Sequence, residues 1–248
     1  MSQNIVETIG DHFRMVAAVT PELKEVVYRL RYQVYCVETG FESSTNFPDG
    51  QEKDEYDELS AHYLIQHLKT GYYAATTRLI LPDTQSLGRL FPIEQHSQIK
   101  RRDILETIPR PELAEASRFC ISKDFKRRPG EQGTVAGIPQ DVGEYHFTEA
   151  ERRTIPFLTL ALIACLVRLS MQNGITHWYA IMEPALVRYF TRLGIYFIPI
   201  GPVTDYHGWR EPCIIKLQDL LDGTKEKNPK AWDLLTDSGQ FWKKDSNH

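Results

Sequence analysis

The chain has 248 residues, of which 42% are hydrophobic and 25% are charged, and a formal net charge of -4. This length and composition favour one soluble α/β domain with a buried core, and the acidic balance excludes the overall basic charge that is typical of nucleic-acid-binding proteins. The four cysteines are far apart and form no CxxC pair, which argues against a zinc ribbon or a disulfide framework and favours a cytoplasmic protein.

No targeting or membrane segment is expected. The N-terminal sequence MSQNIVETIGDHF contains acidic residues and no apolar core, unlike a signal peptide. The most apolar run, Ile155 to Val167, is too short to span a bilayer and ends at Arg168. We therefore expect a buried helix there.

In the first half of the chain, apolar spacing and turn residues predict a strand, a helix and a hairpin. Residues 12–19 are predicted to form the strand, and Thr20 and Pro21 are typical of a helix cap and of a first helical residue. The helix brings Arg31 and Tyr35 onto one face, one turn apart. After it we expect a polar loop over 38–58 with a turn at 54–57, strands over 61–68 and 72–81 around a tight Gly-containing turn, and an irregular segment over 83–113 with a short helix near 98–106.

The second half is predicted to complete the sheet and to hold the longest helix. We expect a strand over 116–122, a long polar segment over 123–153, a helix over 154–172 closed by Asn173-Gly174, a strand over 176–182, a helix over 184–193, and strands over 195–200 and 210–217. Residues from 221 on are expected to form a tail that Trp232, Leu235, Phe241 and Trp242 dock to the body. This order predicts a mixed α/β fold around one sheet.

Ten charged, polar and aromatic residues mark this order of elements, and they are Arg31, Tyr35, Phe41, Asp54, Asp57, Arg78, Glu115, Ser117, Arg118 and Phe119. Their identity and order resemble the motif residues of the acyl-homoserine-lactone synthases and the related N-acyl amino acid synthases. The resemblance covers about residues 12–215. It implies a single-domain GNAT-like fold over residues 1–220, with a mixed, mainly antiparallel sheet flanked by helices and a C-terminal tail over 221–248.

Three departures refine the resemblance. Phe41 stands where the lactone synthases usually have Trp, the segment before the long helix is larger than theirs, and the tail is extra. The chain therefore looks most like the acyltransferases associated with bacterial PEP-CTERM/exosortase systems. The resemblance implies an enzyme that transfers an acyl group from an acyl carrier protein or acyl-CoA thioester to the amine of an amino acid or related metabolite, with no tightly bound cofactor.

Such a transfer needs a neutral amine, yet an α-amino group titrates near pH 8 and is mostly protonated in the cytoplasm. A partly desolvated carboxylate can take this proton, and Glu115 is the candidate base. The alternative is an ion pair of Glu115 with Arg118 or Arg78 that holds the sheet edge. Alternation along a strand would place Glu115, Ser117 and Phe119 on one face and Arg118 on the other.

The remaining charged motif residues have two possible roles. Asp54 and Asp57 share a face of a helical turn and could grip a cationic amine or the guanidiniums of Arg31 or Arg78. The three arginines, Arg31, Arg78 and Arg118, could bind an acceptor carboxylate or form a structural network with the aspartates.

The acyl donor is expected to meet aromatic and basic side chains. Tyr35, Phe41, Ser117 and Phe119 are the candidate substrate contacts, and Phe157 and Trp178, with Leu158 and Leu162, could line an acyl site or pack in the core. The basic residues Lys123, Lys126, Arg127 and Arg128 fit an acidic carrier protein, and the alternative, which the cluster alone favours, is a solvated loop. Backbone N–H groups over 119–122 would stabilise the oxyanion.

Other enzyme classes lack their motifs. The chain contains no GxSxG, HExxH, Walker or GxGxxG sequence, and its eight histidines show no metal-ligand spacing, so no metal site is predicted. Two alternatives stay open: an acyl-homoserine-lactone (autoinducer) synthase that uses S-adenosylmethionine, and a non-catalytic acyl-binding module.

Overall fold

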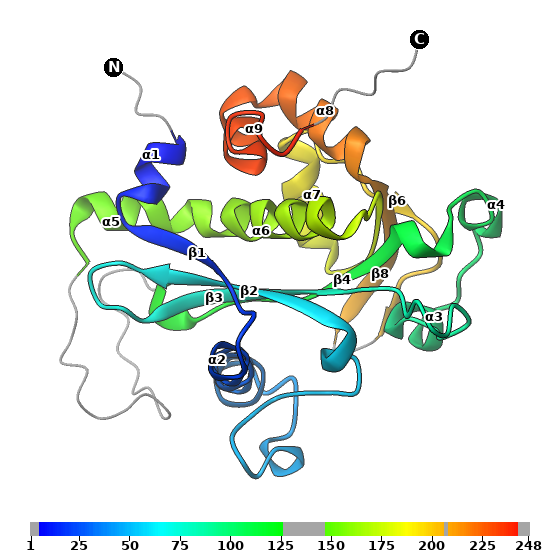
Figure 1. Cartoon of the computed structure of the whole chain (residues 1–248), viewed down its shortest axis with the longest axis horizontal. Helices are drawn as coiled ribbons and strands as arrows, with labels where there is room; N and C mark the ends of the chain where they lie inside the picture. Colours follow the sequence, from blue (N-terminus) through cyan, green and yellow to red (C-terminus); the bar gives the residue numbers. More distant parts are fainter. Residues whose placement is uncertain (1–4, 126–146, 206–207, 243–248) are drawn as a thin grey trace.

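The computed structural model describes residues 5–125, 147–205 and 208–242, which fold around one sheet (Figure 1). Its strands follow the order β1-β2-β3-β4-β5-β8-β6, with β7 paired to β8. Neighbouring strands are antiparallel except β4 and β5, which are parallel, so the predicted mixed, mainly antiparallel sheet is confirmed. The strands are β1 Phe13–Ala17, β2 Ser60–His67, β3 Tyr73–Ile80, β4 Leu113–Ile121, β5 His177–Met182, β6 Ile198–Pro199, β7 Thr204–Asp205 and β8 Trp209–Lys216.

Helices cover both faces of the sheet. In Figure 1, α2 lies below the sheet and α6 lies above it, with α1, α8 and α9 farther out on the α6 side. The helices are α1 Ile5–Gly10, α2 Pro21–Tyr32, α3 Pro92–His96, α4 Arg102–Leu105, α5 Glu149–Thr154, α6 Leu158–Asn173, α7 Pro184–Arg192, α8 Leu217–Lys227 and α9 Pro229–Thr236.

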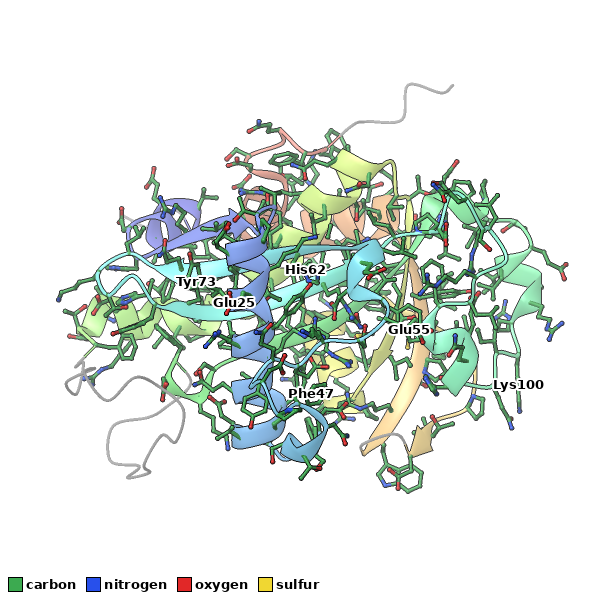
Figure 2. The ribbon with its side chains drawn as sticks, turned by 60° about the horizontal axis from the view of Figure 1, so that its bottom comes forward. Glu25, Phe47, Glu55, His62, Tyr73 and Lys100 are labelled. Carbon is green, nitrogen blue, oxygen red and sulfur yellow. The ribbon has the colours of Figure 1, made fainter. Side chains whose placement is uncertain are left out.

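Helix α2 begins as predicted. The Thr20 hydroxyl accepts a hydrogen bond from the Leu23 N–H at 3.4 Å, and Pro21 is the first helical residue. Val27 and Leu30 are buried on the sheet-facing side. The helix passes into a π-helical segment, Gln33–Glu38. Figure 2 shows that the loop with Phe47 and Glu55 lies on the same face of the sheet as α2.

Helix α6 is the centre of the main core. Its residues from Leu158 to Val167 are almost all fully buried, and it ends at Gly174, whose φ of 67° gives the predicted left-handed C-cap. The helical stretch 149–173 is longer than the apolar run alone and has the length and composition of a membrane span, but 67% of its most apolar window is buried within the fold. We interpret it as the buried core helix that the sequence predicts.

The C-terminal region corrects the expected tail. Helix α8 runs across the boundary placed at residue 220, and α9 packs beside α6. Leu220, Leu221, Leu234 and Leu235 are buried in the main core, because both helices present an apolar face to it. Residues 217–236 are therefore part of the same body rather than an appendage.

Other elements were placed imperfectly by the sequence. Strand β4 starts at Leu113, three residues before the predicted strand, and the short helix α3 was not predicted. The strand expected over 195–200 is reduced to Ile198–Pro199. These three discrepancies involve β-pairing or a short helix, which depend on contacts between distant segments.

Candidate active site

Strand β4 carries the central acid of the candidate site. Glu115 lies where β4 pairs with β5, opposite Tyr179, and its side chain is buried. Its carboxylate oxygen Oε2 accepts a hydrogen bond from the Ile93 N–H in the first turn of α3 at 2.9 Å. Among the residues that the structure describes, Glu115 has no ion-pair partner, so the predicted alternative of an ion pair with Arg118 or Arg78 is wrong.

A β-bulge after Glu115 changes the direction of the strand's side chains. The register with β3 shifts between Thr76 and Arg78, and Arg118 has a φ of 47°. The simple alternation expected for β4 therefore fails at Arg118. Ser117 and Arg118 both contact one charged network on the α2 side, Ser117 by accepting from Arg78 Nε at 2.9 Å.

The network joins three arginines to three acids. Arg31 donates to Glu52 at 2.5 Å and to Asp57 at 2.6 Å. Arg78 donates to Asp54 at 2.6 Å and to Asp57 at 3.0 Å. Arg118 donates to Glu52 at 2.9 Å and to Asp54 at 3.3 Å. The formal charges of these six side chains cancel. The structure brings Arg31, Asp54, Asp57, Arg78 and Arg118 together in one ion-pair network, which is one of the two arrangements that the sequence predicted.

The two kinds of buried acid have opposite electrostatics. Burial alone would raise the pKa of the Asp57 carboxyl, but the guanidiniums of Arg31 and Arg78 outweigh it and hold this pKa well below its usual range. Burial raises the pKa of the Glu115 carboxyl to about 7, although the Ile93 N–H and the positive charges of Arg78 and Arg118 act against the rise. Asp57 is thus held ionised, whereas Glu115 can exchange a proton near neutral pH.

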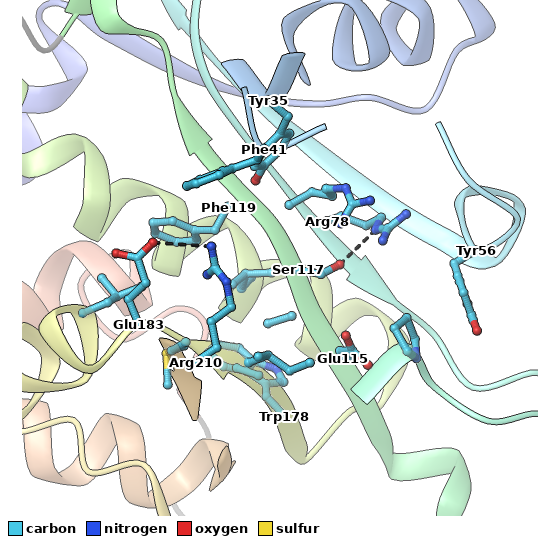
Figure 3. Close-up of a pocket in the computed structure, with 18 of the residues that line it drawn as sticks. Tyr35, Phe41, Tyr56, Arg78, Glu115, Ser117, Phe119, Trp178, Glu183 and Arg210 are labelled. Carbon is cyan, nitrogen blue, oxygen red and sulfur yellow. Dashed lines mark hydrogen bonds and ion pairs between the residues drawn. The ribbon is translucent and has the colours of Figure 1, made fainter. Parts of the chain in front are cut away.

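Glu115 and four members of the network line one cavity of about 820 Å³; these four are Glu52, Asp54, Arg78 and Arg118. Figure 3 shows Glu115, Ser117 and Phe119 along β4, with Trp178 below them in the view and Glu183 and Arg210 at the left, near Phe119. Tyr35 and Phe41 also line the cavity, and the Arg118 guanidinium lies 5.6 Å from the centre of the Tyr35 ring. The predicted substrate contacts Tyr35, Phe41, Ser117, Phe119 and Trp178 therefore surround the same space as Glu115.

The inner part of the cavity is apolar. Ile163 and Leu166 of α6, Trp178 and Met182 of β5, and Phe190 of α7 line it. Trp178 is fully buried and donates through Nε1 to the Ser170 hydroxyl at 2.7 Å. Phe157 is outside the cavity lining and packs against the main core, as do Leu158 and Leu162. These three side chains thus have the packing role that the sequence left open.

Of the basic cluster, only Lys123 lies in the described residues. Its ammonium donates to the Glu38 carbonyl and its N–H donates to the Glu38 carboxylate at 2.9 Å, which fixes the turn after β4. Lys126, Arg127 and Arg128 lie outside the described residues, so their predicted contact with a carrier protein stays a prediction.

Three residues that line the cavity were not predicted from the sequence. Glu52 precedes the Asp54–Asp57 turn in an acidic run, and its pairing with Arg31 and Arg118 became visible only in the fold. Glu183 and Arg210 line the cavity from the end of β5 and from β8. Of the three, only Glu183 had a signal in the sequence, because it directly follows a predicted strand. In the described part of the chain, no group of three or more His, Cys, Asp or Glu side chains is placed to hold a metal ion.

Comparisons with known proteins agree with this architecture. The acetyltransferase (GNAT) domain family matches residues 30–136. Solved structures with similar folds include the CoA-dependent acyl-homoserine lactone synthase BjaI with SAM and isopentyl-CoA, at a TM-score of 0.55 and 21% identity over 91% of this chain and 88% of that one. The chain has a GNAT fold.

Two further relatives connect the fold to acyl transfer. FeeM, an N-acyl amino acid synthase from uncultured soil microbes, has a TM-score of 0.53 and 13% identity over 86% of this chain and 94% of its own. A curated acyl-homoserine-lactone synthase of Vibrio anguillarum is 32% identical over 109 residues, which are 41% of this chain and 49% of the relative. The match thus spans about half the length of that relative. These relatives are acyltransferases, and the similarity to PEP-CTERM-associated enzymes stays a prediction.

Proposed function

We propose that this GNAT-fold chain is a cytoplasmic acyltransferase that moves an acyl group from a carrier thioester to an amine. The observation that carries the proposal is Glu115, a buried carboxyl with a pKa of about 7 that lines the cavity and has no arginine partner in the described chain. A base needs such a pKa to accept a proton near neutral pH and still be partly ionised. The paired acids Asp54 and Asp57 lack it.

The reaction would proceed by direct transfer. Glu115 takes one proton from the ammonium of the acceptor, and the neutral nitrogen attacks the thioester carbonyl carbon. The C–N bond forms, the C–S bond breaks, and the second ammonium proton leaves with the thiol. Glu115 then returns its proton to solvent, so atoms and charges balance.

Strand β4 offers groups for the developing oxyanion. It pairs with β5 from Leu113 to Glu115. Beyond Glu115 the two strands separate around the cavity, and backbone N–H groups on that side of β4 can face a substrate. Within the predicted donor segment 119–122, the Ser122 N–H already donates to the Ala74 carbonyl at 2.9 Å, so we propose that the donors come from residues 119–121.

Binding of the acyl chain would use the apolar part of the cavity. Ile163, Leu166 and Phe190 form walls that exclude water from a hydrocarbon chain, and each buried methylene contributes about 0.8 kcal/mol. The arginine network positions β4 and the Asp54–Asp57 turn without reacting itself, which is how such enzymes gain much of their rate. An acyl carrier protein or acyl-CoA supplies the thioester, and an amino acid or similar metabolite accepts the acyl group.

Thiol release tests the proposal. Purified protein is mixed with acyl carrier protein or CoA thioesters of several chain lengths and with a panel of amines, and free thiol is followed with time. Release that depends on both an acyl donor and an amine is expected. If no combination of donor and amine releases thiol, and mass spectra show that the protein retains an acyl ligand, the protein is instead a non-catalytic acyl-binding module.

A second candidate is an acyl-homoserine-lactone synthase that uses S-adenosylmethionine. The match to the Vibrio anguillarum synthase favours it. Production of methylthioadenosine and a lactone distinguishes this candidate, because transfer to a simple amino acid yields neither.

A further inference from the structure

Three side chains from distant parts of the sequence meet at one side of the cavity, outside the chemistry described above. Arg210 Nη2 in β8 lies 3.4 Å from Glu183 Oε1, at the residue between β5 and α7. The Arg210 guanidinium also lies 5.6 Å from the centre of the Phe41 ring. All three residues line the cavity, and Figure 3 shows the Glu183 carboxylate next to the Arg210 guanidinium, with the Phe119 ring close to both.

The pairing of Arg210 with Glu183 differs from the pairings in the arginine network. For Arg31, Arg78 and Arg118 the nearest carboxylate oxygen is 2.5 to 2.9 Å away. The Arg210–Glu183 contact is longer, and 53% of the Glu183 side chain is exposed. Because exposed ion pairs contribute little, Glu183 can be exchanged for another anion at small cost, whereas the network acids cannot.

Glu183 is also free to turn away without harm to the fold. It caps α7 through its backbone, whose carbonyl accepts from the Leu186 N–H at 2.9 Å, and its side chain makes no capping hydrogen bond. The beginning of α7 adds a favourable potential for an anion at this place. The ring of Phe41 holds the guanidinium by a cation–π contact that does not need Glu183.

We propose that Arg210 binds the anionic group of a substrate, a carboxylate or a phosphate, and that Glu183 holds its place until the substrate arrives. The proposal deepens, and rests on, the acyltransferase function. The anion has two possible sources: the carboxylate of an amino-acid acceptor, or the phosphate of the donor's phosphopantetheine arm. Either one would form charge-assisted, bidentate hydrogen bonds with the guanidinium.

Calorimetry measures the affinity for two matched pairs of ligands and so distinguishes the acceptor carboxylate from the donor phosphate as the source of the anion. The acceptor pair is N-dodecanoylglycine, which has a carboxylate, and neutral N-dodecanoylethanolamine. The donor pair is S-dodecanoyl phosphopantetheine and S-dodecanoyl pantetheine, which lacks the phosphate. We expect the wild type to bind the charged member of one pair about 10-fold or more tightly than the neutral member, the ratio given by one charged hydrogen bond.

Two substitutions should act in opposite directions. Arg210→Gln should abolish the preference by weakening the charged member alone, and Glu183→Gln should strengthen the charged member several-fold because a competing carboxylate is gone. Arg192→Gln and Glu226→Gln, exposed residues outside the cavity, serve as controls and should change neither. Circular dichroism confirms that each variant is folded.

The proposal fails if the wild type does not distinguish charged from neutral members in either pair. It fails equally if both substitutions weaken all ligands to the same extent, the result expected of a structural ion pair. Should Arg210→Gln not fold, the Glu183→Gln result alone decides. Because these are binding measurements, a chain that binds the charged ligands but releases no thiol would refute the proposed function and leave the anion site standing.

Discussion

Asp57 and Glu115 are both buried acids of the same site, yet their surroundings give them opposite protonation behaviour. Asp57 contacts Arg31 and Arg78, which keep it ionised. Glu115 accepts a hydrogen bond from the Ile93 N–H and has no ion-pair partner in the described chain, so burial raises its pKa to about 7. The difference shows that the local partners, rather than burial itself, separate a structural acid from an acid that can accept a proton.

The largest expected effect comes from Glu115→Gln. We expect turnover to fall by roughly 10² to 10⁴-fold, because the amide cannot take the amine's proton. Thiol release measures the change, and Glu106→Gln, an exposed residue outside the cavity, is the control. An undiminished rate in Glu115→Gln would remove the distinction between the two acids.

The same variant should not be less stable. The folded-state pKa of Glu115 lies above the ordinary value of 4.5, so stability from this carboxyl is present at low pH and is lost as pH rises to about 7. A glutamine avoids that loss and can still accept from the Ile93 N–H. Urea unfolding at pH 8 should show Glu115→Gln about 1 to 3 kcal/mol more stable than the wild type.

Asp57→Asn should change stability in the opposite direction to Glu115→Gln and should destabilise the fold strongly. Removing this charge leaves the guanidiniums of Arg31 and Arg78 buried with incomplete compensation. We expect the free energy of unfolding to fall by about 3 to 5 kcal/mol in urea titrations. Its exposed neighbour Glu58, changed to Gln, should have no measurable effect, and a loss for Asp57→Asn below about 1 kcal/mol would place Asp57 among ordinary surface pairs.

The pH dependence of kcat/KM sharpens the comparison further. The base must be ionised, so kcat/KM should rise about tenfold per pH unit below pH 7 and level off above it. The Asp57 carboxyl, already ionised, should leave no inflection in this range. A profile that is flat from pH 5 to 8 would show that the proton acceptor titrates elsewhere.

The smallest predicted effect is that of Ser117→Ala. This change removes the oxygen that accepts from Arg78 Nε and should lower the free energy of unfolding by about 1 to 2 kcal/mol. The midpoint of the pH profile should stay where it is, because in the described structure the Glu115 carboxylate accepts from the Ile93 N–H and the Ser117 hydroxyl accepts from Arg78. Ser43→Ala on the exposed loop is the matched control.

Residue patterns predicted the elements whose signals are local. The cap at Thr20, the hairpin after residue 60 and the Gly174 C-cap all depend on neighbours in sequence, and the structure confirms them. The bulge at Arg118 and the position of Arg210 beside Glu183 depend on pairings across the sheet. These could not be predicted from one chain, because no local residue pattern encodes which distant partner a side chain meets.

The most direct test of the central claim is titration of the Glu115 carboxyl itself. Carbon-13 NMR of protein labelled at glutamate side chains, with Glu115→Gln to assign the signal, measures its pKa in the folded state. We predict a pKa of about 7 for Glu115. A pKa at or below the ordinary 4.5 would contradict it, because Glu115 would then be another structural acid like Asp57.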